Sequence, residues 1–150
     1  DRAPSPRPAG RRFEGIPGLV PGTAGFSDAR RAEILERLMR LFVDQYASGI
    51  PRLDAAVAGG QWRDAREALH AFKGSCGVIG ATDLLARVAS LESDLAAAAR
   101  DGRTPDPARV RAESQAIGDC LNELLDELRA RLADGERTAS ASAQADVESA

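Results

Sequence analysis

Large apolar residues in the middle of this chain recur at spacings of three and four, and this pattern most restricts what the chain can fold into. The clearest run has successive spacings of 3, 4, 3, 4 and 3 and consists of Trp62, Ala65, Leu69, Phe72, Cys76 and Ile79. At 3.6 residues per turn, these side chains share one face of a helix. No stretch of alternating β-branched residues competes with the pattern. The chain is therefore predicted to be all-α.

The same rhythm predicts three more helical segments. One begins with Ile34, Leu38, Leu41 and Gln45, with Phe42 beside them, and continues through Tyr46, Ile50, Leu53 and Val57, with a kink or a new helix at Pro51. Another follows a break at Gly80, ends at Asp101-Gly102 and carries Leu84, Val88, Leu91, Leu95 and Ala98. The last starts with Asp106 as N-cap and Pro107 as first helical residue, and carries Ile117, Leu121, Leu124 and Leu128, flanked by Leu125 and Leu132. Short turns between such helices favour an antiparallel up-and-down four-helix bundle over residues 28–133.

The two ends of the chain differ in composition from this middle portion. Residues 1–27 hold five of the eight prolines, five of the fourteen glycines and four arginines, which predicts a linker or an extra helix. Residues 134–150 are rich in Ala, Ser and acidic residues and lack large side chains, which predicts a disordered tail.

Composition excludes several classes of function for the chain. Two cysteines, Cys76 and Cys120, and one histidine cannot form a four-ligand zinc site, and no metal site is expected. The net charge of −3 lacks the basic excess that nucleic-acid binding needs. No run of ~20 apolar residues occurs, so no direct membrane contact is expected. A protein partner fits these properties better.

His70 is the residue that points to chemistry, because it lies ~200° around the helix from the apolar residue Phe72. Its own face carries Gly74 and Gly77 at plus four and plus seven, and Lys73 lies one turn away. Arg66 and Arg63, at minus four and minus seven, extend the positive strip. Lys73 is the only lysine in a chain with nineteen arginines.

These residue types suit an imidazole that carries a phosphoryl group transiently. Neutral imidazole is a good nitrogen nucleophile near pH 7, and an ammonium beside it stabilises charge on phosphoryl oxygens. Each glycine inside a helix destabilises it by ~1 kcal/mol relative to alanine, so two of them beside an exposed histidine need a reason. Close approach by another protein supplies that reason.

The residues around His70 resemble the histidine-containing phosphotransfer (HPt) domains of multistep bacterial two-component signalling. The matching run is His70, Lys73, Gly74, Ser75, a small residue at 76, Ile79, Gly80 and Ala81, followed by Leu84 and Leu91-Glu92. Upstream, Phe42, Leu53, Ala56 and Gly60-Gln61-Trp62 resemble the preceding helical hairpin, so the similarity spans most of residues 30–130. The sequence departs from the residues most frequent in this family at Leu69, at Cys76 and at the pair Gly77-Val78.

The resemblance implies a four-helix bundle whose histidine accepts a phosphoryl group from a receiver-domain aspartate and passes it to a response regulator. His70 would be the phosphoacceptor, and Lys73 would stabilise the charge on the phosphoryl oxygens. Gly74 would have a clearance role, in which its missing side chain leaves room for the partner to approach. Arg63, Arg66, Gly77 and Ser75 are candidate partner contacts, although Ser75 could equally orient the imidazole or face a helix junction. A polar side chain from a neighbouring helix often assists in this family, and the sequence does not assign it. No cofactor is expected in this domain, since Mg²⁺ belongs to the partner receiver.

Two other classes of function compete with that of a phosphoryl carrier. A kinase is disfavoured because no glycine-rich ATP-binding segment is present and Ala71 follows the histidine, where a kinase dimerisation hairpin has an acidic residue. The other alternative is a non-catalytic helical interaction or oligomerisation module, which would have no need for Gly74 and Gly77.

The wider setting is predicted from the start of the chain. It begins at Asp1, its only methionine is Met39, and its lead-in is rich in Pro, Gly and Arg. We therefore expect the C-terminal module of a cytoplasmic or inner-membrane-anchored hybrid sensor kinase, with the receiver of the same or a partner kinase as donor. A freestanding relay protein is the other option.

Overall fold

A computed structural model of the chain describes residue 13, residues 15–16, residue 19 and residues 28–148. Its helices are α1 (Asp28–Tyr46), α2 (Pro51–Ala58), α3 (Trp62–Ile79), α4 (Thr82–Arg100) and α5 (Pro107–Glu148). Within these described residues no strand forms, and the only β-type pairing is an isolated antiparallel bridge between Leu19 and Ala81. The predicted all-α class is confirmed.

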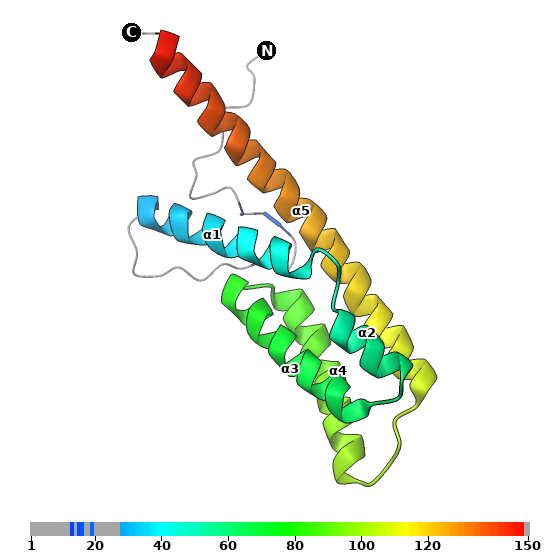
Figure 1. The fold of residues 1–150 in the computed structure, drawn as a ribbon. Helices are drawn as coiled ribbons and strands as arrows, with labels where there is room; N and C mark the ends of the chain where they lie inside the picture. Colours follow the sequence, from blue (N-terminus) through cyan, green and yellow to red (C-terminus); the bar gives the residue numbers. More distant parts are fainter. Residues whose placement is uncertain (1–12, 14, 17–18, 20–27, 149–150) are drawn as a thin grey trace.

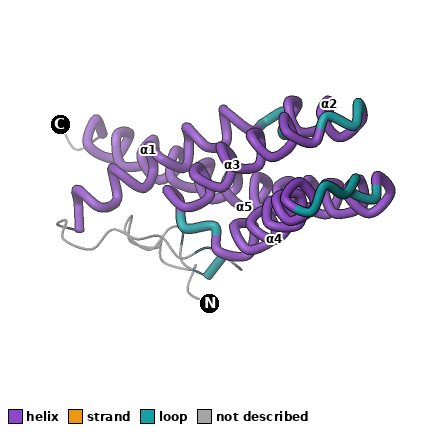
Figure 2. The backbone as a smooth tube through the Cα atoms, turned by 90° about the horizontal axis from the view of Figure 1, so that it is seen from below, coloured by secondary structure: helices purple, strands orange, loops and turns teal. Residues whose placement is uncertain are grey.

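The helices α2, α3, α4 and α5 form a four-helix bundle in which each packs against the next and α5 closes onto α2. Helix α1 packs on α3 and α5 at the end of the bundle away from the loop between α4 and α5 (Figures 1 and 2). Pro51 begins α2 after the break at residues 47–50, so the first predicted segment consists of two helices. Proline suits this position because its missing N–H would have no partner in a first helical turn.

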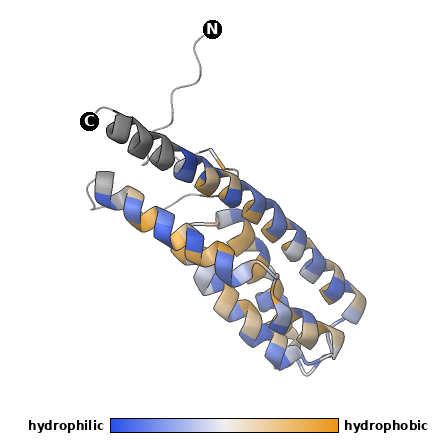
Figure 3. Ribbon diagram, turned by 45° about the horizontal axis from the view of Figure 1, so that its top comes forward, coloured by the Kyte–Doolittle hydropathy of each residue, from blue (hydrophilic) through white to orange (hydrophobic). Residues whose placement is uncertain are grey.

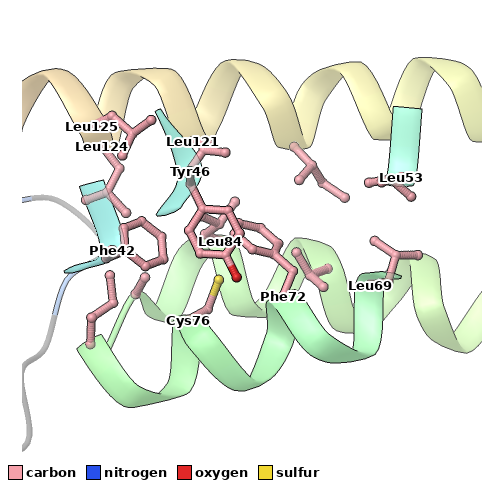
Figure 4. Packing of buried hydrophobic residues seen from close by; sticks show 14 of the residues in the cluster. Phe42, Tyr46, Leu53, Leu69, Phe72, Cys76, Leu84, Leu121, Leu124 and Leu125 are labelled. Atoms are coloured by element: carbon pink, nitrogen blue, oxygen red, sulfur yellow. The ribbon is translucent and has the colours of Figure 1, made fainter. Parts of the chain in front are cut away.

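The predicted apolar faces of α3, α4 and α5 are buried almost residue for residue. On α3, all of the predicted stripe is buried except Trp62, which is partly exposed. The predicted stripes of α4 and α5 are buried throughout. Figure 3 shows the hydrophobic residues turned inward along these helices, and Figure 4 shows Leu69, Phe72 and Cys76 of α3 reaching toward α5.

The buried face of α1 differs from the predicted one. Phe42 and Tyr46 are buried as predicted, but Leu41 is 57% exposed and Gln45 is exposed. The other buried side chains of this helix are Leu35, Met39 and Val43. The reason is an aromatic cluster in which the Tyr46 ring meets the Phe72 ring edge-on, with 4.8 Å between centroids. The ring centroids of Phe42 and Tyr46 are 4.9 Å apart in the same cluster (Figure 4). Rings bury more area than Leu41 would, so they set the rotation of the helix.

The break at Gly80 and the N-cap at Asp106 form as the sequence predicts. Gly80 ends α3 with φ of 76°, and the amides of Gly80 and Ala81 donate to the carbonyls of Gly77 and Cys76. This is the paired hydrogen bonding of a Schellman motif, in which a glycine takes up the left-handed conformation. Asp106 caps α5, since its side chain accepts a hydrogen bond of 3.1 Å from the Ala108 amide.

Some residues at each end of the chain belong to the described structure. Phe13, Ile16 and Leu19, inside the predicted linker, are buried in the hydrophobic core. The rest of residues 1–27 lies outside the described residues. Helix α5 includes residues 134–148 of the predicted tail, and Glu136 forms an ion pair of 2.9 Å with Arg40 of α1. Alanine is the best helix former, so this stretch continues the helix without large apolar residues.

Candidate functional site

His70 lies near the middle of α3 on the side opposite the buried stripe. Because Leu69 and Phe72 point into the core, the helical period turns His70 outward. Its side chain is 73% exposed, which confirms the predicted placement outside the apolar face. The imidazole is therefore open to another molecule.

Glu92 of α4 holds the imidazole in place. His70 Nδ1 and Glu92 Oε1 are 2.9 Å apart, a hydrogen-bond distance. The other carboxylate oxygen, Oε2, forms an ion pair with Lys73 Nζ at 2.7 Å. One carboxylate thus joins the imidazole and the ammonium, the two groups that the sequence singles out.

The charge on Glu92 decides which nitrogen of His70 carries the proton. Burial raises the pKa of the Glu92 carboxyl, but the contacts with Lys73 and His70 together outweigh burial and bring this pKa below its usual value. A carboxylate ionised at neutral pH only accepts hydrogen bonds, so Nδ1 is the donor. The neutral ring then has an unprotonated Nε2 with its lone pair available.

The sequence does not identify Glu92 as the partner of His70, because that requires the register between two helices. A signal was nevertheless present. The turn between α3 and α4 is short and centred near Ala81, and His70 and Glu92 each lie eleven residues from Ala81. In a tight antiparallel hairpin, residues equidistant from the turn lie side by side.

Gly74 and Gly77 continue the face of His70 toward the end of α3. A Cβ atom built on either glycine would meet no heavy atom within 4 Å. Packing within the described part of the chain therefore gives no reason for a glycine at either position. Val78, next to Gly77, is 60% exposed, so an apolar side chain also faces outward here.

Arg63 and Arg66 lie on the other side of His70, toward the start of α3. They line an open depression of about 540 Å³ together with Glu67, His70, Ala71 and Glu92. Arg63 is 90% exposed and lies 3.6 Å from Glu67. Arg66 is half-buried, and its Nε is fully buried without a hydrogen-bond partner among the described residues.

Ser75 has a different environment from the other predicted site residues. It is half-buried and accepts a hydrogen bond of 2.7 Å from the hydroxyl of Tyr46, on α1. Of the two interpretations left open for Ser75, the contact at a helix junction is the one the structure shows. The partner contact through Ser75 stays a prediction.

No group of three His, Cys, Asp or Glu side chains is placed to hold a metal ion anywhere in the described ranges. Among the helices of residues 28–148, none combines the length and the apolar character needed to cross a bilayer.

The family model for the Hpt domain matches residues 37–135, more than half of the chain. The chain therefore belongs to the Hpt domain family, whose members are phosphoryl carriers that use a histidine in phosphorelays. No curated protein and no solved structure matches the chain. Hpt domains interact in general with receiver domains and response regulators, which defines the class of partner.

Proposed function

We propose that His70 is the phosphoacceptor of this Hpt domain and exchanges a phosphoryl group with receiver-domain aspartates. The observation that carries this proposal is the geometry of one side chain. The imidazole of His70 is exposed, its Nδ1 is fixed on Glu92, and its Nε2 is left as the available nucleophile.

In the proposed step, the lone pair of Nε2 attacks the phosphorus of an aspartyl phosphate. The N–P bond forms while the bond from phosphorus to the aspartate oxygen breaks, and the receiver carboxylate leaves with that electron pair. The proton on Nδ1 stays in place, so the phosphorylated ring becomes cationic. Glu92, hydrogen-bonded to that nitrogen, stabilises the charge where it develops. Transfer to the next receiver is the reverse reaction.

Lys73 and the two glycines support this role in different ways. Lys73 Nζ and the imidazole contact the same carboxylate, that of Glu92. Lys73 follows His70 by less than one helical turn. Phosphoryl transfer depends mainly on positioning and electrostatics, so a cation here favours the reaction. Gly74 and Gly77 leave the surface beside His70 bare, where a receiver domain must approach within a few ångströms.

We further propose that the donor is the receiver of the same or a partner hybrid sensor kinase and that the acceptor is a response regulator. The parent protein would then work in the cytoplasm or from the inner membrane. The domain carries the group and supplies no ATP site of its own.

Incubation with a phosphorylated receiver tests the proposal. The chain has a single histidine, so acid-labile, alkali-stable label on the protein must disappear in His70→Gln. Circular dichroism checks that the variant remains helical. Normal labelling of His70→Gln would refute the proposal, and a wild-type domain that takes no label but oligomerises would support the interaction module instead.

Lys73→Ala separates chemistry from docking. Because Lys73 is 34% exposed and engaged by Glu92, its loss removes a cation near Nε2 but little contact surface. We expect the transfer rate at saturating receiver to fall roughly tenfold. The receiver concentration for half-maximal rate should change little. The opposite pattern would make Lys73 a recognition residue.

A further inference from the structure

Arg66 differs from the other cations near His70 because its side chain has no acidic partner in the part of the chain that the structure describes. Lys73 is engaged by Glu92, and Arg63 lies beside Glu67. The side chain of Arg66 makes no hydrogen bond or ion pair within the described residues, and its Nε is shielded from water. A buried donor without an acceptor is destabilising, so this arrangement needs a reason outside the fold.

The position of Arg66 places it on the approach to the imidazole. It lies one turn before His70 on the same face of α3. Both residues line the same depression, with Glu92 on its α4 side.

The charges around the site leave a phosphoryl group in need of a cation. A phosphoryl group carries a charge of roughly −1.5 to −2 at neutral pH. The positive charge of Lys73 is already countered by Glu92 at 2.7 Å. Arg66 offers a planar guanidinium that matches phosphoryl oxygens and forms no ion pair with a carboxylate among the described residues.

We propose that Arg66 is a catalytic residue that binds the phosphoryl oxygens on Nε2 of His70, during transfer and in the phosphorylated domain. This inference rests on the proposed function of His70. It separates Arg66 from Arg63, although the sequence groups the two as partner contacts. Arg66 contributes only donors and charge, so no further bond is made or broken.

The test uses two phosphodonors, a phosphorylated receiver and phosphoramidate, a small donor that needs no docking surface. Arg66→Gln should slow labelling of His70 by both donors about tenfold or more, and Arg66→Lys should recover part of the rate. Arg111→Gln is the matched control, because it removes the same charge from an exposed position of α5, outside the depression at His70. It should leave labelling by phosphoramidate unchanged.

Two further readouts exclude other roles. If Arg66 merely stabilised the fold, Arg66→Gln would lower the urea midpoint of unfolding, whereas we expect that midpoint unchanged or raised. If Arg66→Gln slowed only the receiver reaction, by raising the half-saturating receiver concentration, Arg66 would be a docking residue and the proposal would fail. A wild-type domain labelled on His70 by phosphoramidate but not by the receiver would overturn the proposed function alone. No label from either donor would overturn both.

Discussion

Gly74 weakens the helix that carries His70, and nothing in the described structure packs against it. Gly74→Ala should therefore raise the free energy of unfolding by about 1 kcal/mol, since alanine is the better helix former. Gly74→Leu should also keep the fold but slow phosphotransfer from a receiver, because its side chain covers the approach to His70. Urea unfolding and the rate of labelling measure the two effects.

The control for Gly74 is another helical glycine. Gly118 of α5 also has no heavy atom within 4 Å of a Cβ. Gly118→Ala and Gly118→Leu should stabilise the helix without changing the rate of phosphotransfer. Equal transfer rates in Gly74→Leu and the wild type would contradict the clearance role of Gly74.

Glu92 makes part of the stability of the domain depend on pH. Its pKa in the folded protein is below its usual value, whereas in the unfolded chain it is about 4.3. The ionised carboxylate therefore stabilises the fold above that unfolded value, and this contribution is lost as the pH falls through the lower folded pKa. Glu92→Gln should be less stable than the wild type at pH 7, and the difference should shrink at pH 3.5.

Urea unfolding at pH 7, 5 and 3.5 measures this difference. Glu123→Gln, at an exposed position of α5, controls for the loss of one negative charge. A gap between wild type and Glu92→Gln that stays constant across these pH values would show that the ion pair with Lys73 and His70 does not stabilise the fold.

At the scale of the element, the sequence predicts a buried face where one helical stripe stands alone. The stripe of α3 has no rival, so Leu69, Phe72 and Cys76 are buried as predicted and His70 faces outward. In α1 the predicted pattern includes both Leu41 and Tyr46, and only Tyr46 is buried, because its ring packs against Phe72, a residue of another helix. A pattern within one helix cannot contain that information.

The turn between α3 and α4 determines which residues of the two helices meet, and Gly80 makes that turn possible. With φ of 76°, Gly80 is in the left-handed region, where a Cβ is strained by roughly 1–2 kcal/mol. Gly80→Ala should lower the free energy of unfolding by about that amount. Urea unfolding measures it, with Gly118→Ala as the glycine substitution that carries no such strain.

The same variant bears on the site, because this turn sets the register of Glu92 against His70. If the hairpin shifts, the hydrogen bond from Nδ1 weakens and labelling of His70 should slow as well. A Gly80→Ala domain with unchanged stability would show that the left-handed conformation at this turn is not required.

At the scale of the whole molecule, the part least predictable from sequence is the contribution of the N-terminal segment to the core. Phe13, Ile16 and Leu19 stand among prolines, glycines and arginines, with no helical period to mark them as buried. Their burial depends on the shape of the finished bundle. Leu19 pairs with Ala81 at the α3–α4 turn, and Ile16 lines one cavity together with Leu124 of α5.

The segment should therefore stabilise the bundle without taking part in phosphotransfer. Phe13 is 2% exposed, and replacing a buried phenylalanine with alanine typically destabilises a protein by about 3–5 kcal/mol. Phe13→Ala should lower the free energy of unfolding by about 3 kcal/mol, measured with urea. Ala81 lies eleven residues beyond His70, about 16 Å along a helix, so the labelling rate of the folded fraction should not change. A Phe13→Ala domain as stable as the wild type would mean that the four helices complete their core without this segment.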